Sequence, residues 1–198
     1  LARKLEYIYV DSGAMYRAVT LYAMQNNLIS TSYFHKDKLV GDLIKINLMF
    51  RSNAELGFAE IYLNDVNVEK KIRNIEVSEL VSKVAEVSEV RRKLVQQQQQ
   101  FGINKRVVMD GRDIATVVFP DAELKLFVTA SIEVRTERRF LELEAKGDVL
   151  SKEEVKANLI HRDNIDSTRE DSPLIQTEDA VLIDNSLMTR EEQLHLAH

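Results

Sequence analysis

The chain has 198 residues, of which 44% are hydrophobic and 30% charged, a balance that suits one large globular domain or a core domain with insertions. No apolar run approaches the roughly 20 residues of a membrane-spanning helix, no signal-peptide pattern opens the sequence and cysteine is absent. We therefore expect no membrane contact, a cytoplasmic location and no disulfide or thiolate metal site, while the net charge of −5 argues against general nucleic-acid binding.

The first predicted element is a short buried strand over Tyr7–Val10, which ends at Asp11. Gly13 permits a tight turn there, and Ser12 is a suitable cap for the helix that follows. Arg17 then lies one to two turns into that helix. The stretch fits either an anion-binding turn or a capped helix with a solvated arginine.

Residues 35–100 break the pattern of the rest of the chain, and we predict that they form an insertion on a core. Helical sequence over His35–Met49 precedes a short antiparallel hairpin that turns at Asn64-Asp65. Helical sequence follows over Val77–Gln100. The consecutive glutamines Gln96–Gln100 are good helix formers, and we expect a solvated helix end there.

Further apolar runs predict buried strands over Val107–Met109, Leu124–Val128 and Val181–Ile183. Helical stretches separate the runs, and this alternation predicts an α/β fold with a mostly parallel sheet. Ligands collect at the carboxyl ends of the strands in such sheets. Asp110 and Asp184 directly follow strands, as Asp11 does, which supports a site at that edge, although aspartate is also common in turns.

The stretch Asp110-Gly111-Arg112-Asp113 places charged side chains directly after a strand. Gly111 lets the backbone turn sharply. Arg112 can grip phosphate oxygens with two parallel hydrogen bonds, and Asp113 can accept from an amino group such as that of cytosine. A local ion pair within a turn is the alternative interpretation.

A helix is predicted from Ser151, because Ser151 and Glu154 have the spacing of a capping box. On this helix Arg162, Asp166 and Arg169 stand at i, i+4 and i+7 and share one face. That stripe is suited to clamping a polyanion. A ladder of surface salt bridges is the alternative interpretation.

Three motifs in this order resemble bacterial cytidylate kinases: DSGAMYR at 11–17, GRDIATVVFPDA at 111–122 and RDNIDSTR at 162–169. The resemblance extends over essentially the whole chain. It implies a P-loop NTPase fold, with a parallel-sheet core and helices on both faces. The core would comprise residues 1–34 and 101–198 with a helical lid at about 144–170, and residues 35–100 would be a nucleoside-monophosphate-binding insertion with a small antiparallel sheet.

The implied activity is transfer of the γ-phosphoryl group of ATP to CMP or dCMP, in pyrimidine nucleotide metabolism. By resemblance, Arg17, Arg112 and Arg169 hold the phosphate of the acceptor. Arg162 and Asp166 reach its ribose. Arg112, Arg162 and Arg169 are the residues expected to act in catalysis by neutralising charge on the transferred group.

The resemblance also implies how the base is read. Ser12, Ser82, Arg91 and Asp113 would contact cytosine, with Asp113 accepting from the exocyclic amine that UMP lacks. Ala115 stands where the family usually has glycine, which makes the backbone beside Asp113 a point of difference.

The sequence contains fewer of the residues that the family uses to bind ATP, the phosphoryl donor. Arg135 and Arg138, followed by Arg139, resemble arginines of the donor site and lid. No glycine has the G-x-x-x-x-G-K-[ST] context of the loop that grips ATP phosphates. Because Leu1–Leu5 resembles the helix that follows this loop, we expect that residues before Leu1, and a few near Leu5, are omitted. Mg2+ would accompany ATP, and no metal ligand is assigned.

Two alternatives remain. One is a related nucleoside-monophosphate or deoxynucleoside kinase with a broader acceptor range, which an assay across several acceptors distinguishes. The other is a non-catalytic nucleotide-binding protein, if the phosphate loop is truly absent. We expect a monomer that binds ATP and CMP or dCMP and no nucleic acid.

Overall fold

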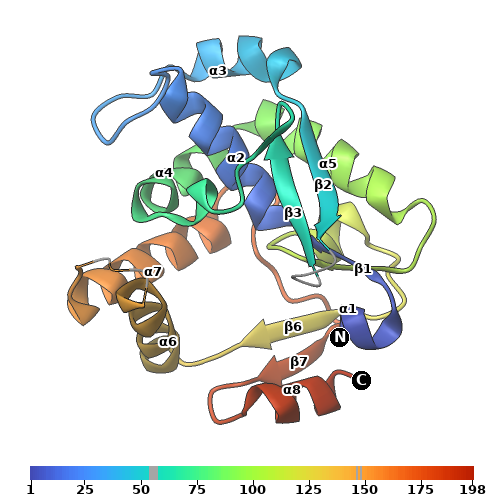
Figure 1. The fold of residues 1–198 in the computed structure, drawn as a ribbon. Helices are drawn as coiled ribbons and strands as arrows, with labels where there is room; N and C mark the ends of the chain where they lie inside the picture. Colours follow the sequence, from blue (N-terminus) through green and yellow to red (C-terminus); the bar gives the residue numbers. More distant parts are fainter. Residues whose placement is uncertain (54–57, 146, 148) are drawn as a thin grey trace.

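The computed structural model describes residues 1–53, 58–145, 147 and 149–198. Parallel strand pairs carry the fold (Figure 1): β1 (Ile8–Asp11) pairs with β5 (Val107–Asp110), and β6 (Leu126–Thr129) pairs with β7 (Val181–Asp184). Each predicted strand forms within one or two residues of its expected place, but the prediction that the strands are buried is wrong, since only Val10 and Ile183 in them are buried. The predicted α/β fold with parallel strands and a small antiparallel sheet is confirmed.

The turn from β1 into α2 (Ser12–Gln25) begins directly at the end of the strand. The side chain of Asp11 caps this helix by accepting a hydrogen bond from the backbone N–H of Ala14 at 2.9 Å. The prediction that Ser12 is the cap is therefore wrong by one residue. Ser12 is instead the first helical residue and is buried.

The insertion begins with helix and continues as an antiparallel sheet. Its first elements are α3 (Lys36–Asp42), the 3-10 turn η1 (Leu43–Lys45), β2 (Leu48–Asn53), β3 (Phe58–Leu63) and β4 (Val66–Asn67). The predicted hairpin is confirmed, and Asn64 and Asp65 both adopt positive φ, 48° and 65°, as a tight hairpin turn requires. The helix predicted to reach Met49 is wrong beyond Lys45. There Leu48 is buried and Met49 exposed, the two-residue alternation of a strand.

The second half of the insertion is helical in two pieces. It contains the 3-10 turn η2 (Lys71–Arg73), α4 (Ile75–Ala85) and α5 (Ser88–Gly102). The single helix predicted over Val77–Gln100 is therefore divided, because the backbone becomes extended at the buried Val87. The glutamine run is also not uniformly solvated: Gln98 is 0% exposed.

The remaining elements are helices that flank the strands. They are α1 (Ala2–Leu5), the π-helical turn η3 (Ile114–Val118), α6 (Ile132–Glu144), α7 (Lys152–Thr168) and α8 (Arg190–Leu196). The predicted capping box is confirmed, since Ser151 Oγ accepts from the backbone of Glu154 and the Glu154 carboxylate accepts from Ser151 N–H at 2.8 Å. This fixes the start of α7.

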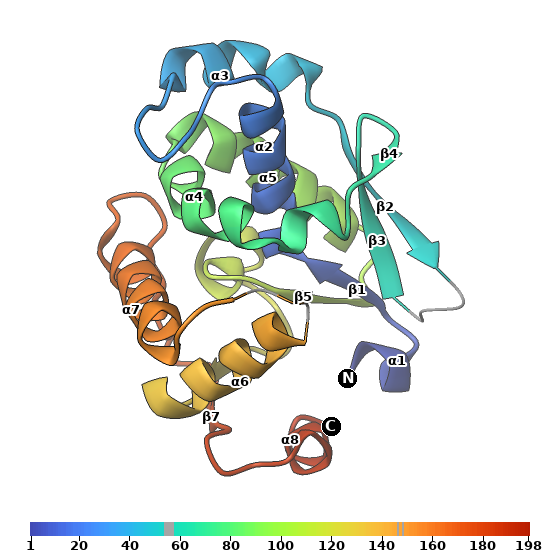
Figure 2. The ribbon, with the colours of Figure 1, turned by 60° about the vertical axis from the view of Figure 1, so that its left-hand side comes forward.

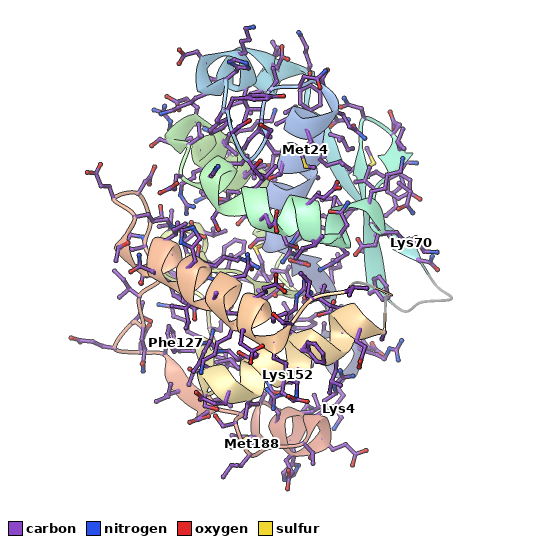
Figure 3. All side chains as sticks on the ribbon, turned by 90° about the vertical axis from the view of Figure 1, so that its left-hand side faces the viewer. Lys4, Met24, Lys70, Phe127, Lys152 and Met188 are labelled. Carbon is purple, nitrogen blue, oxygen red and sulfur yellow. The ribbon has the colours of Figure 1, made fainter. Side chains whose placement is uncertain are left out.

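The arrangement of the helices determines where a site can form. Figure 2 shows α2, α4 and α5 gathered on one side of β1 and β5, with α6 and α7 alongside. Helix α4 contacts both α2 and α7. In Figure 3 it lies between Met24, in the last turn of α2, and Lys152, at the start of α7. One hydrophobic cluster joins α2 to the insertion. Within the described ranges, no helix is long and apolar enough to cross a membrane.

Candidate functional site

A cavity of about 280 Å³ lies at the carboxyl ends of β1 and β5. Parts of the chain that are far apart in sequence contribute to its wall: the start of α2, α4, α5, the loop after β5 and the last turns of α7. Every residue that the sequence predicts to bind the acceptor nucleotide lines it, namely Ser12, Arg17, Ser82, Arg91, Arg112, Asp113, Arg162, Asp166 and Arg169.

Asp166 connects α7 to the loop after β5. Its carboxylate accepts from Arg112 Nε at 2.8 Å and from Arg169 Nη1 at 3.3 Å. Arg169 lies just past the end of α7, and it also donates from Nε and Nη2 to the carbonyl oxygen of Ser172 at 3.0 and 2.7 Å. These bonds orient two arginines toward the cavity before any ligand is bound.

Arg91 and Asp113 form a buried ion pair in the same wall. Arg91 on α5 is 2% exposed and Asp113 is 3% exposed, and Arg91 Nη2 donates to the Asp113 carboxylate. Arg91 Nη1 donates to the carbonyl oxygen of Ala85 at 3.2 Å, and the guanidinium lies 5.6 Å from the ring centroid of Tyr16. A buried pair of this kind needs close mutual compensation, which fixes both groups.

Arg17 and Arg162 bring positive charge to the cavity, which the nearby carboxylates of Asp11 and Asp166 offset only in part. Neither has an ion-pair partner in the part of the chain that the structure describes, and the Nε of Arg162 is buried without a hydrogen-bond partner. Burial and the neighbouring charges of Arg17 and Arg112 lower the pKa of Arg162 to about 10. Burial also lowers the pKa of Arg17, against the attraction of Asp11. An anion in the cavity relieves both effects.

Sequence reasoning missed several residues of the wall. Arg73, at the end of η2, pairs with Asp11 at 2.8 Å and with Glu69 at 2.7 Å. Asp110 lies opposite Asp11 in the strand register and accepts from the hydroxyl of Tyr9 at 3.0 Å. Burial and the charge of Asp11 raise the pKa of Asp110. The sequence did mark Asp11 and Asp110, because each is the last residue of a strand, but it assigned neither of them a binding role.

The third aspartate that ends a strand does not join the site. Asp184 is the last residue of β7, in the other parallel pair, and accepts from the backbone N–H of Ser186 at 2.9 Å. It is exposed and absent from the cavity wall. Its role is the local turn that such aspartates commonly make.

The predicted donor-side arginines do not line this cavity. Arg135 pairs with Asp163 at 2.6 Å, joining α6 to α7. Arg138 donates to the side-chain and main-chain oxygens of Asn185 at 2.9 and 2.8 Å. Arg139 donates to Ser78 at 3.4 Å. The donor role of these arginines stays a prediction.

Close packing restricts the loop after β5. A Cβ placed on Gly111 would lie 2.1 Å from Ser12 Oγ and 2.9 Å from Ile114 Cδ1. The backbone then enters the π-helical turn that contains Ala115, where the N–H groups of two residues share the carbonyl oxygen of Asp113. Any side chain at this position would therefore require Ser12 and Ile114 to shift.

Comparison with known proteins agrees with this geometry. The family model described as cytidylate kinase matches residues 1–196. A cytidylate kinase of Flavobacterium johnsoniae is 62% identical over 193 residues, which are 98% of this chain and 84% of that protein. A cytidylate kinase of Flavobacterium psychrophilum is 57% identical over 99% of this chain and 87% of that protein. A cytidylate kinase of Parabacteroides distasonis is 57% identical over 98% of this chain and 84% of that protein. The chain belongs to the cytidylate kinase family.

Proposed function

We propose that the chain transfers the γ-phosphoryl group of ATP to CMP or dCMP, giving CDP or dCDP. The observation that carries the proposal is the positive charge of Arg17 and Arg162, which lack ion-pair partners among the described residues, in a cavity whose wall also contains Arg112. A phosphate dianion supplies the missing counter-charge, and guanidinium groups bind phosphate oxygens in a defined geometry. Family membership supports a nucleoside monophosphate as the anion.

In this proposal the phosphate and the sugar of the acceptor have separate partners. Arg17, Arg112 and Arg169 hold the phosphate. Arg162 and Asp166 lie toward the ribose. The hydrogen bonds of Asp166 to Arg112 and Arg169 support a second role, because they hold both guanidinium groups in place before the nucleotide arrives.

The base is selected by the buried ion pair of Arg91 and Asp113. Asp113 accepts from the exocyclic amine of cytosine, while Arg91, Ser12 and Ser82 complete the contacts to the ring. UMP has no amine at that position, and its carbonyl oxygen would face the Asp113 carboxylate. The penalty for this mismatch is large in a buried site.

Phosphoryl transfer requires two phosphates in line and neutralisation of the charge between them. Arg112, Arg162 and Arg169 are placed to neutralise the acceptor side. The described residues contain no group of three or more His, Cys, Asp or Glu side chains suited to a metal. We expect Mg2+ to accompany ATP, whose phosphates would hold it and where it would reduce the repulsion between donor and acceptor oxygens.

The proposal also assigns the parts of the chain. Residues 35–100 form the insertion that receives the acceptor, residues 1–34 and 101–198 form the core, and the segment at about 144–170 acts as a lid. Closure of the lid excludes water and protects ATP from hydrolysis. We propose that the protein works as a monomer, since the described cavity is completed by one chain.

An assay of ATP consumption with CMP, dCMP, UMP and AMP tests the proposal. We expect turnover with CMP and dCMP, and kcat/KM for UMP and AMP lower by about 100-fold or more, the discrimination that a site built around a hydrogen bond gives. Equal turnover of UMP and CMP would favour the broader kinase. No turnover of any acceptor, with CMP still bound, would favour a non-catalytic nucleotide-binding protein.

A further inference from the structure

Arg91 is buried in the cavity wall, and one of its three guanidinium nitrogens makes no hydrogen bond among the described residues. Its Nη2 meets Asp113 and its Nη1 meets the carbonyl oxygen of Ala85, whereas Nε is buried without a hydrogen-bond partner among the described residues. Buried N–H groups almost always have an acceptor, because an unsatisfied one is unfavourable. The Nε–H group therefore lacks an acceptor that a further side chain or a ligand could supply.

A second carboxylate near that position is Asp171, in the loop that follows α7. Its Oδ1 is 4.0 Å from Arg91 Nε, beyond hydrogen-bond distance but close enough for attraction. The side chain of Asp171 is 41% exposed and its Oδ1 accepts from the neighbouring Ser172 Oγ at 3.0 Å, so a move toward Arg91 changes this local bond but unpacks no core. Burial raises the pKa of Tyr16 to about 12, and the charge of Asp171 contributes to that rise, which places Asp171 within electrostatic reach of the cavity wall.

The loop that carries Asp171 is tied to the acceptor site on both sides. Arg169 binds the carbonyl oxygen of Ser172 through two donors, and the backbone N–H of Leu174 donates to the carbonyl oxygen of Asp166 at 2.7 Å. Ser172 has a φ of 53°, a conformation that residues other than glycine rarely adopt. A ligand that shifts Arg169 or Asp166 therefore also shifts Asp171.

We propose that Asp171 is a positioning residue for the acceptor base: when CMP fills the cavity, Asp171 accepts the Nε–H of Arg91. The guanidinium is then held between Asp113 and Asp171, and its orientation toward the base is fixed. This inference rests on the proposed function and extends it to a residue outside the cavity wall.

Titration calorimetry with CMP tests the proposal on the unsubstituted chain and on three variants. Asp171→Ala should weaken CMP binding about tenfold, the effect of losing one hydrogen bond to a charged group. Asp171→Asn keeps an oxygen that accepts from Nε, so its affinity should stay within about threefold. Glu170→Ala, which changes an exposed neighbour in the same loop, should bind CMP as the unsubstituted chain does.

The NMR chemical shift of the Arg91 Nε–H proton distinguishes the proposed role from a merely structural role of Asp171, which would leave the shift unaffected. Its NMR signal, assigned by its loss in Arg91→Lys, should shift downfield when CMP is added to the unsubstituted chain and should not shift in Asp171→Ala. If Asp171→Ala binds CMP as tightly as the unsubstituted chain, or shows the same shift, the inference is overturned and the proposed function stands. If the unsubstituted chain fails to bind CMP, both are overturned.

Discussion

At the scale of single residues, the arginines of the site differ in whether a carboxylate pairs with them. Arg91 is paired with Asp113, and Arg73 with Asp11 and Glu69. Arg17 and Arg162 have no such partner among the described residues, and burial lowers the pKa of both. Partly buried charge without a partner is unfavourable for folding. Its presence in a cavity therefore indicates an anionic ligand.

Replacing Arg17 with methionine tests this balance. We expect kcat/KM for CMP to fall by about 100-fold or more, because a desolvated contact to phosphate is lost. The melting temperature should stay the same or rise, since an uncompensated charge is removed. The control is Arg92→Met on α5, where the side chain is exposed, and there neither quantity should change. A kcat/KM of Arg17→Met within threefold of the unsubstituted chain would show that Arg17 does not hold the phosphate.

The role of Asp113 is tested by comparing two acceptors. In Asp113→Ala, kcat/KM should fall far more for CMP than for UMP, because only CMP has the amine that Asp113 accepts. The variant also leaves Arg91 buried without its partner, and we expect the free energy of unfolding to fall by about 3–5 kcal/mol. The ratio of the two kcat/KM values is independent of the folded fraction. Equal losses for CMP and UMP would refute the assigned role.

The pair of aspartates at the strand ends predicts a pH effect on stability. Burial and the charge of Asp11 raise the pKa of Asp110, so the folded chain holds this proton more tightly than the unfolded chain. The contribution of Asp110 to stability is therefore complete below about pH 4, the ordinary range of aspartate, and is lost as the pH rises through the raised value.

Asp110→Asn should accordingly raise the free energy of unfolding at pH 7 and change it little near pH 3, as measured by urea denaturation. Asp179→Asn is the control of opposite sign, because the hydrogen bond from Lys125 lowers the pKa of Asp179. That variant should not stabilise the chain at pH 7. The same change at both pH values for Asp110→Asn would contradict the argument.

At the scale of elements, the loop between β5 and η3 packs closely against α2 at Gly111. Gly111→Ala places a methyl group against Ser12 and Ile114, and we expect it to cost about 1–3 kcal/mol of unfolding free energy and to weaken CMP binding. Gly41→Ala on α3 meets no atom within 4 Å and should stabilise the chain by up to about 1 kcal/mol. Thermal unfolding of both variants decides this, and a neutral Gly111→Ala would show that the loop has room.

The elements also show what local sequence can and cannot predict. The strands and α7 were predictable because each has a clear local signal, such as the capping box of Ser151 and Glu154. The segment around Leu48 was not, because short apolar spacing there fits a helix as well as a strand, and only pairing with β3 decides between them. Gln98 was misjudged because composition says nothing about which face of α5 packs inward.

At the scale of the whole molecule, the cavity exists because separate stretches meet at one edge of β1 and β5. The motifs identified the acceptor residues one stretch at a time, and only the resemblance to a family joined them. Arg73 could not be found in this way, because a hairpin and a 3-10 turn bring it to Asp11. Side-chain partners such as Asp166 with Arg112 likewise depend on tertiary packing, which no local pattern specifies.

A crystal structure of the protein with CMP tests the central claim most directly. We predict one CMP in the cavity, with its phosphate within hydrogen-bond distance of Arg17, Arg112 and Arg169 and its amine on Asp113. A nucleotide bound elsewhere, or a base turned away from Asp113 while these arginines contact no phosphate, would contradict the account.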